Sequence, residues 1–318
     1  MKITKKLLSI SMVMVLALSM ITGCGAKDDS TKKKVIGVAI ADFSDQFQVH
    51  VMNQMKTEAA KHTDFEILYQ DGKYDAQKQI SQVENLIVKQ VDAIILFQVD
   101  DESAMTAAKK AKEAGIPLIV VNRPLPDASY AVSYVGSNSV ESGEIQATQL
   151  VKELDGKGNI VILNGTLGSA PQRDRRKGYD NILKDYPDIK ILGENSADWA
   201  RDKGMKIMEN WLQKDMKIDA VLSNNDEMAM GAINAIEAAG KTGEMIVTGI
   251  DGTPEAYEYI EKDQMTFTVF QDAFGQGAGS IDAAVKTVNG ETVEKEIIIP
   301  YKLVTKDKVA EFKALFNK

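Results

Sequence analysis

Short apolar runs alternate with longer segments of helical periodicity along most of this chain, and this rhythm restricts the fold more than any other feature. The runs at residues 35–40, 65–69, 93–97 and 117–121 are nearly continuous, and the segments between them place apolar residues three or four positions apart. Strands that are apolar on both faces are typical of parallel sheets covered by helices on both sides. The pattern therefore predicts an α/β fold.

The same rhythm restarts in the second half of the chain. Further strands are expected near residues 160–163, 189–192, 220–222 and 245–249, and helices near 141–154, 172–185, 201–214, 227–239 and 254–262. The chain is thus predicted to form two doubly wound parallel-sheet lobes of similar build. Its 318 residues, 44% of them hydrophobic, suffice for two domains that each bury a core.

Composition excludes several classes of protein. The single cysteine rules out a disulfide framework and a multi-cysteine zinc site. A formal charge of −8 argues against a binder of duplex nucleic acid. His50 and His62 both fall on the first expected helix, about 120° apart, so they do not converge on one metal ion. We expect neither a metal nor a cofactor.

The first residues have the pattern of an export signal. A basic head with three lysines precedes an apolar run at residues 7–21, which at about 1.5 Å per residue is short for a bilayer of about 30 Å. The run ends in Ile21-Thr22-Gly23-Cys24, which resembles the lipobox of bacterial lipoproteins. The resemblance implies cleavage before Cys24 and a diacylglyceryl anchor on that cysteine. The alternative is an ordinary signal peptide with an incidental cysteine.

The residues after Cys24 predict a tether. Residues 25–34 are polar and charged and show no apolar period. The Lys32-Lys33-Lys34 run is compatible with contact to anionic headgroups and equally with a solvated charge run. We therefore expect a signal peptide at 1–23, a tether at 24–34 and a folded part that begins near Val35.

Candidate site residues follow from the position of ligands in doubly wound sheets, which bind beyond the carboxyl ends of the strands. The segments there are 42–48, 98–100, 122–123, 165–175, 198–199, 224–226, 251 and 271–272. They mix carboxylates, amides and guanidiniums with a few aromatic rings. Hydroxyl-rich neutral ligands need this mixture because each hydroxyl both donates and accepts a hydrogen bond, while rings cover the C–H faces of a sugar.

Several of these segments resemble the ribose/galactose-type periplasmic binding proteins, the receptors of sugar ABC importers. The blocks that carry the resemblance lie at residues 121–123, 224–232, 249–254 and 268–272. It extends over essentially all of residues 35–318. In character, the chain is closest to the inositol/rhizopine-like and galactose-like branches.

The resemblance implies two α/β lobes joined by a three-crossover hinge, the type I periplasmic-binding-protein fold. Lobe one would comprise residues 35–136 plus 272–299, and lobe two 137–271 plus 300–318. The implied function is an extracytoplasmic substrate-binding lipoprotein that binds a neutral monosaccharide or cyclitol, hexose or inositol-like, between closing lobes. Its partners would be an importer permease and ATPase. We expect a monomer that is anchored to the outer face of the bacterial cytoplasmic membrane.

The resemblance also assigns ligand contacts. These are Asp45, Phe47, Gln48, Asn122, Arg123, Arg175, Trp199, Asn225, Asp251 and Gln271. Two positions depart from the ribose-type pattern, because Gln48 and Ile250 stand where ribose-type members have phenylalanine. These exchanges argue against a pocket shaped for ribose.

Each assignment has a structural alternative. Asp45 and Asn225 are also suited to cap a helix N-terminus. Asp251, followed by glycine, is compatible with ordinary turn chemistry. Trp199 fits a protein core, although its neighbours are charged. Arg175 lies in a run of charges that solvent could cover.

Three other functions are alternatives for a chain of this fold class. An enzyme is disfavoured because no Gly-x-Gly-x-x-Gly follows a strand and no complete phosphate-binding loop or nucleophile elbow occurs. A regulator of the lac-repressor type needs a DNA-binding segment where the signal stands. A sensory receptor feeding a chemoreceptor or kinase remains an alternative, as does a pentose, nucleoside or autoinducer as the ligand.

Overall fold

The computed structural model describes residues 33–214 and 216–317. The predicted signal peptide, Cys24 and most of the tether therefore lie outside the described residues. All described helices and strands belong to the unit Lys34–Lys318. Among them, no helix combines the length and the apolar character needed to cross a membrane.

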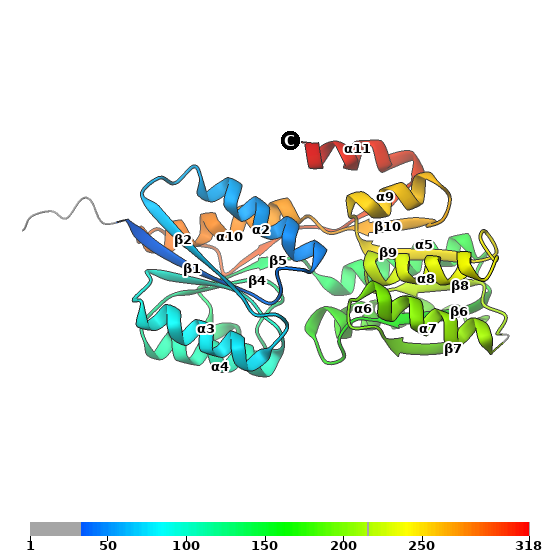
Figure 1. Ribbon diagram of the computed structural model, residues 1–318, viewed down its shortest axis with the longest axis horizontal. Coiled ribbons are helices and arrows are strands. Elements are labelled where there is room, and N and C mark those ends of the chain that lie inside the picture. The colour runs from blue at the N-terminus through cyan, green and yellow to red at the C-terminus, as the bar shows by residue number, and fades with distance from the viewer. Residues whose placement is uncertain (1–32, 215, 318) are drawn as a thin grey trace, which may run out of the picture. The chain divides into compact units, whose positions relative to one another are not determined.

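The first sheet has six strands in the order β11-β5-β4-β3-β1-β2. They are β1 (Lys34–Ile40), β2 (Phe65–Asp71), β3 (Ala93–Phe97), β4 (Leu118–Asn122), β5 (Ser133–Gly136) and β11 (Glu296–Ile298). All neighbouring pairs are parallel. This sheet and the helices that cover it are called lobe one (Figure 1).

The second sheet repeats this topology in the order β12-β10-β9-β8-β6-β7. Its strands are β6 (Gly158–Asn164), β7 (Ile189–Ser196), β8 (Ala220–Ser223), β9 (Ile246–Asp251), β10 (Phe267–Phe270) and β12 (Lys302–Thr305). The pairing is parallel except that β12 runs antiparallel to β10. This sheet and its helices form lobe two.

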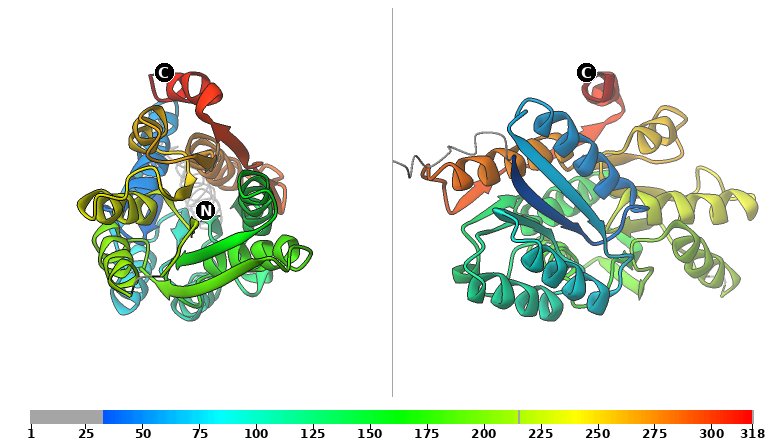
Figure 2. Two further views of the ribbon diagram at one scale, coloured as in Figure 1. Left: turned by 90° about the vertical axis from the view of Figure 1, so that its right-hand side faces the viewer. Right: turned by 60° about the vertical axis from the view of Figure 1, so that its left-hand side comes forward.

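Helices cover both faces of the first sheet. α2 (Gln46–Ala59) and α10 (Ala273–Val288) pack on one face, and α3 (Ala76–Val88) and α4 (Asp101–Glu113) on the other (Figures 1 and 2). Val38 and Ile95 point into the core on the side of α2 and α10, while Ala39 and Ile94 point into the core on the side of α3 and α4. Successive residues of one strand face opposite sides of the sheet, so each strand must be apolar throughout.

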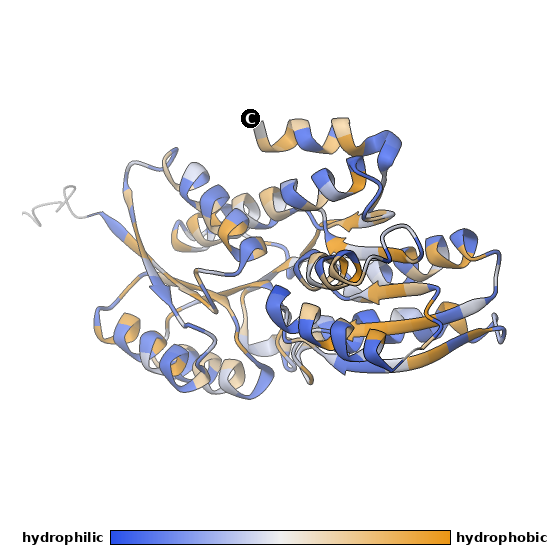
Figure 3. Cartoon of the chain, turned by 45° about the vertical axis from the view of Figure 1, so that its right-hand side comes forward, coloured by the Kyte–Doolittle hydropathy of each residue, from blue (hydrophilic) through white to orange (hydrophobic). Residues whose placement is uncertain are grey.

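Lobe two has the same layers. α5 (Ser139–Glu153) and α6 (Ala170–Leu183) cover one face, and α7 (Arg201–Gln213), α8 (Asp226–Ala238) and α9 (Pro254–Glu261) cover the other. The C-terminal α11 (Val309–Lys313) packs with the second group. Figure 3 shows the strands as largely hydrophobic, whereas the helices alternate between hydrophobic and hydrophilic residues.

The predicted fold class, two doubly wound α/β lobes, is confirmed. All eight predicted strands occur, with ends that differ by a few residues, and so do the predicted helices. Four strands were not expected from the sequence, and each has only three or four residues: β5, β10, β11 and β12. Segments this short show no clear hydrophobic periodicity. The exact limits of the two lobes stay a prediction.

Candidate ligand-binding site

One cavity gathers every residue predicted to contact the ligand. Its lining comes from strand ends and helix starts of both lobes. The lining residues are Asp45, Phe47, Gln48, Phe97, Asn122, Arg123, Pro171, Arg175, Trp199, Asn225, Asp251 and Gln271. The structure therefore brings the ten predicted residues together, while their contact with a ligand stays a prediction.

Asp45 is both a helix cap and part of the cavity wall. Its Oδ1 accepts a hydrogen bond from the backbone N–H of Gln48 at 3.0 Å, which caps α2. Its Oδ2 accepts from Gln48 Nε2 at 3.2 Å and from the Tyr74 hydroxyl. Burial and the nearby Asp45 carboxylate raise the pKa of Tyr74, so this hydroxyl remains a donor. Capping and cavity lining thus coexist at Asp45.

Asn122 and Arg123 form the lobe-one wall at the end of β4. Asn122 has a φ of 66°, and its Nδ2 donates to Gln276 Oε1 at 2.9 Å. Arg123 is buried, and its Nη1 donates to the backbone oxygens of Gln98 and Val99, both at 3.0 Å. Backbone acceptors therefore fix the guanidinium, and no carboxylate of the described residues lies within 4 Å of it.

Arg175 is the buried cation of lobe two. From α6 it donates through Nη1 to the backbone oxygen of Asn224. Its Nη2 donates to Gln271 Oε1 at 2.9 Å and to the Tyr301 hydroxyl at 3.5 Å. The side chain is only 4% exposed. The solvated role considered for Arg175 is therefore wrong, because the helix turns this residue of the charged run inward.

The Trp199 indole is held in place by its neighbours. Its backbone has a φ of 66°, and its carbonyl accepts from Asn225 Nδ2 at 3.2 Å. A Cβ built on Gly165 would lie 2.1 Å from the ring, so only glycine leaves room for it. The ring lies 5.6 Å from the Arg175 guanidinium and 5.9 Å from that of Arg123. Trp199 thus contacts cations of both lobes at the cavity.

Asn225 also has two roles. Its Oδ1 accepts from the Met228 backbone N–H at 3.0 Å and caps α8. Its amide nitrogen holds the Trp199 backbone, as described above. The capping role proposed from the sequence is confirmed, and the residue still lines the cavity.

Asp251 is the charged group of the cavity with the fewest protein partners. It is 7% exposed, and its nearest cation is Arg175 Nη2 at 3.9 Å. Within the described residues no hydrogen bond reaches its carboxylate. Burial raises the pKa of Asp251 well above its ordinary value. Its φ of 135° is a strained value for a residue with a side chain, and such strain is common at binding sites.

A second hollow adjoins the cavity. It shares five lining residues with the inner cavity: Asp45, Phe47, Trp199, Asn225 and Asp251. Its other walls are mainly charged or polar. The hollow therefore connects the inner cavity with the cleft between the lobes.

The lobes also touch beside the cavity. Arg173 of α6 donates to Asp101 of α4 at 2.8 Å, which joins lobe two to lobe one. The Arg123–Trp199 contact is a second link between them. The two lobes are therefore close enough here to enclose a small molecule.

Some cavity residues were not foreseen. Phe97 ends β3, directly before the predicted segment 98–100, and only the strand boundary concealed it. Pro171 lies at the start of α6, inside the predicted segment 165–175. Tyr74 and Tyr301 carried no sequence signal, because each reaches the site from an element distant in the chain.

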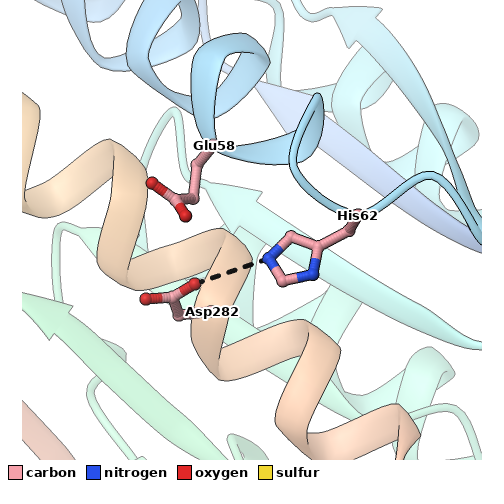
Figure 4. Close-up of side chains that lie close together, drawn as sticks. All are labelled: Glu58, His62 and Asp282. Atoms are coloured by element: carbon pink, nitrogen blue, oxygen red, sulfur yellow. Dashed lines mark ion pairs between the residues drawn. The ribbon is translucent and has the colours of Figure 1, made fainter.

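A separate cluster lies between α2 and α10. Glu58, His62 and Asp282 place one ligand-type atom each within 4.8 Å of the others, and His62 Nε2 is 3.7 Å from Asp282 Oδ1 (Figure 4). The Lys61 ammonium already lies 2.7 Å from the Glu58 carboxylate. We interpret the cluster as partly buried charged groups gathered around one imidazole.

This region corrects one expectation. His62 was predicted on the first helix, but α2 ends at Ala59 and His62 lies in the turn that follows. Its backbone N–H donates to the Ala59 oxygen at 3.0 Å, a tight turn that leads into β2. The 120° separation of the two histidines therefore does not apply, although they still lie apart. His50 contacts the Phe316 ring instead.

Comparison with known proteins identifies the family. The family model for a periplasmic binding protein domain matches residues 36–292. The chain belongs to the periplasmic binding protein family. The predicted resemblance is thereby confirmed, and so is the general class of a sugar-type binding protein of ABC importers.

The relatives of this periplasmic binding protein cover nearly its whole length. A protein of Rhizobium meliloti to which rhizopine binding has been ascribed is 41% identical, over 88% of this chain and 92% of its own. The ribose import binding protein of Bacillus subtilis (strain 168) is 30% identical, over 93% and 98%.

A solved structure supports the same assignment. An ABC transporter solute binding protein from Bacillus halodurans C-125, with bound myo-inositol, is 44% identical. The match covers 90% of this chain and 99% of that one, with a TM-score of 0.87. The family name places such proteins in the periplasm, which agrees with predicted export.

Proposed function

We propose that the cavity binds one neutral polyhydroxylated ring, a cyclitol or a hexose. The main support for this proposal is that the charges of the cavity wall balance. Two carboxylates, those of Asp45 and Asp251, stand against two guanidiniums, those of Arg123 and Arg175. A charged ligand would leave one buried charge without compensation, which is costly. Hydroxyl groups can donate to the carboxylates and accept from the guanidiniums.

The aromatic part of the lining fits the same class of ligand. Phe47 comes from lobe one and Trp199 from lobe two, and both line the cavity. Flat apolar rings can cover the C–H faces of a saturated ring while polar neighbours bind its edge. The structural relative with bound myo-inositol makes this cyclitol the first candidate.

We further propose that the two lobes close over the ligand and deliver it to the permease and ATPase of an ABC importer. A ligand that touches both lobes favours the closed state, because it interacts more strongly with that state than with the open one. All predicted contacts lie on the two facing walls, which supports this mechanism.

A screen of thermal stability tests the proposed ligand class. The mature protein would be heated with myo-inositol, scyllo-inositol, D-galactose, D-allose, D-ribose and xylitol, since bound ligand raises the melting temperature by mass action. We expect a cyclitol or hexose to give the largest shift. Asp251→Asn should reduce that shift and leave the unliganded protein folded. If no polyol raised the melting temperature, the proposal would fail.

The membrane anchor is a separate proposal, because Cys24 lies outside the described residues. We propose that a diacylglyceryl group on Cys24 holds the exported protein at the outer face of the membrane, as the Ile21–Cys24 pattern suggests. Two acyl chains give stable anchoring where one gives only marginal binding. Cys24→Ala should move the protein from the membrane fraction to the soluble fraction. Unchanged membrane association would contradict a lipid anchor.

A further inference from the structure

Asp226 is a carboxylate with an unusual environment. It is the first residue of α8, a position where acidic side chains normally face solvent, yet it is fully buried. Burial raises its pKa to about 6. It does not line the cavity, so its retention at this position needs another explanation.

The Asp226 carboxylate joins three elements of lobe two. Its Oδ2 accepts from the backbone N–H groups of Gly252 at 2.8 Å and Thr253 at 2.9 Å. Its Oδ1 accepts from the Thr268 hydroxyl on β10 at 2.6 Å. Two successive N–H groups that point at one anion form a concave binding site for negative charge. Asp226 supplies that charge from within the protein.

The two N–H groups belong to the residues that directly follow Asp251. Asp251 has a φ of 135° and Gly252 a φ of 71°, so the chain makes a strained turn where β9 ends. Such strain persists only where surrounding contacts over-determine it. A Cβ on Gly249 would lie 2.1 Å from Asp226 Oδ1, which shows how closely the carboxylate fits behind this turn.

We infer that Asp226 is the positioning residue that holds the Asp251 carboxylate toward the ligand cavity. The inference rests on the proposed function of that cavity. Asp226 bonds the backbone after Asp251, and no protein hydrogen bond among the described residues fixes the Asp251 side chain itself. The direction of that side chain therefore depends on the turn.

The test separates positioning from simple stabilisation by measuring binding and folding together. Asp226→Asn should raise the Kd for the best polyol about 10- to 100-fold, the effect of a lost charged hydrogen bond. In an Asp251→Asn background the same change should add less than about 3-fold, because residues that act through one another are not additive. Independent, multiplying effects on Kd would overturn the inference.

A matched control is Asp219→Asn. The Asp219 carboxylate also accepts a backbone N–H in lobe two, that of Asn159 at 2.7 Å, but at the start of β6 and away from the cavity. The Asp219→Asn substitution should lower the melting temperature and leave the Kd for the polyol unchanged. If Asp226→Asn fails to fold, Thr268→Val removes one hydrogen bond to the same carboxylate and should raise Kd about 3-fold. An unchanged Kd in Thr268→Val would then contradict the inference.

A measurement without ligand keeps this inference distinct from the proposed function. In the unliganded protein, Asp226→Asn should accelerate hydrogen exchange at the Gly252 and Thr253 amides, while amides in β6 keep their rates. Unchanged exchange at both amides would overturn the inference even if the wild type binds polyols. Failure of the wild type to bind any polyol would instead refute the proposed function.

Discussion

In lobe one the carboxylate that faces the cavity, Asp45, already accepts hydrogen bonds from protein groups, whereas in lobe two no group of the described residues donates a hydrogen bond to the carboxylate of Asp251. Asp45 accepts from Gln48 and Tyr74, and Arg123 is fixed by two backbone oxygens. Within the part of the chain that the structure describes, the nearest cation to the Asp251 carboxylate of lobe two lies 3.9 Å away, and the Asp251 backbone is strained. Two sheets of equal topology therefore provide walls of different character.

This difference suggests that the two lobes contribute to ligand binding in different ways. The lobe-one wall is preorganised, so it needs little reordering when a ligand arrives. A ligand hydroxyl would give the buried Asp251 carboxylate a hydrogen bond that the described protein groups do not supply, so this carboxylate should contribute strongly to selectivity. Ligands that lack the matching hydroxyl would leave this charge unpaired.

The largest expected effect concerns the two buried arginines. Arg175→Met should lower the free energy of unfolding by about 3–5 kcal/mol, because it removes the cation that lies 3.9 Å from the buried carboxylate of Asp251. Arg123→Met should cost about 1–3 kcal/mol, since the hydrogen bonds that it removes end on neutral backbone oxygens and not on a buried carboxylate. Denaturant unfolding of the unliganded variants measures both. Equal losses would contradict the proposed difference between the lobes.

The second effect concerns the indole in lobe two. Gly165→Ala places a methyl group 2.1 Å from the present position of the Trp199 ring, so the ring must move. We expect Kd for the polyol to rise about 10- to 100-fold, as displacement of a positioning group by about 1 Å can cost this much. Gly279→Ala on α10 of lobe one is the control, and its Kd should match the wild type. A wild-type Kd in Gly165→Ala would remove Trp199 from the site.

The third effect is that folding stability and ligand affinity should change with pH in opposite directions. Burial raises the pKa of Asp226 from 3.8 to about 6 and also raises that of Asp251. The contribution of Asp226 to folding is therefore fully present below pH 3.8 and is lost as the pH rises through about 6, and that of Asp251 is lost as the pH rises through its own raised pKa. Ligand affinity should instead increase with pH, because hydroxyls bind the ionised Asp251 better. Calorimetry in two buffers should detect proton release on binding; proton uptake would contradict this.

The smallest effect concerns the contact between the lobes. Arg173→Ala removes the partly exposed pair with Asp101 and should raise Kd only about 2-fold, as surface ion pairs contribute little. The effect should disappear at high salt. Arg176→Ala, three positions along the same helix, pairs only within lobe two and should leave Kd unchanged. A large loss in Arg173→Ala would mean that this pair controls closure.

The sequence was most informative for features that depend on a single strand or helix and not on contacts between distant elements. The run at 93–97 was predicted to the residue, because a fully buried strand is apolar throughout. Strand β7 was foreseen only at 189–192, since most of its residues are exposed at the sheet edge. Strand-end position alone brought Asn122, Asp251 and Gln271 into the candidate set.

Features that depend on distant contacts were not predictable. Asp226 looks like an ordinary acidic residue in the first turn of a helix, and only its contacts with Gly252 and Thr268 reveal its burial. Tyr74 reaches Asp45 from another loop. The turn that removes His62 from α2 likewise depends on where β2 must begin. The hydrophobic periodicity of a sequence cannot predict contacts between residues that are distant in the chain.

The central claim is that one neutral polyol is held by both lobes at once. Calorimetric titration of the wild type, Asn122→Ala of lobe one and Asp251→Asn of lobe two with myo-inositol tests it most directly. We predict one ligand per chain, with Kd raised at least about 10-fold in each variant and more in Asp251→Asn. Wild-type affinity in either variant, or a stoichiometry other than one, would contradict the account.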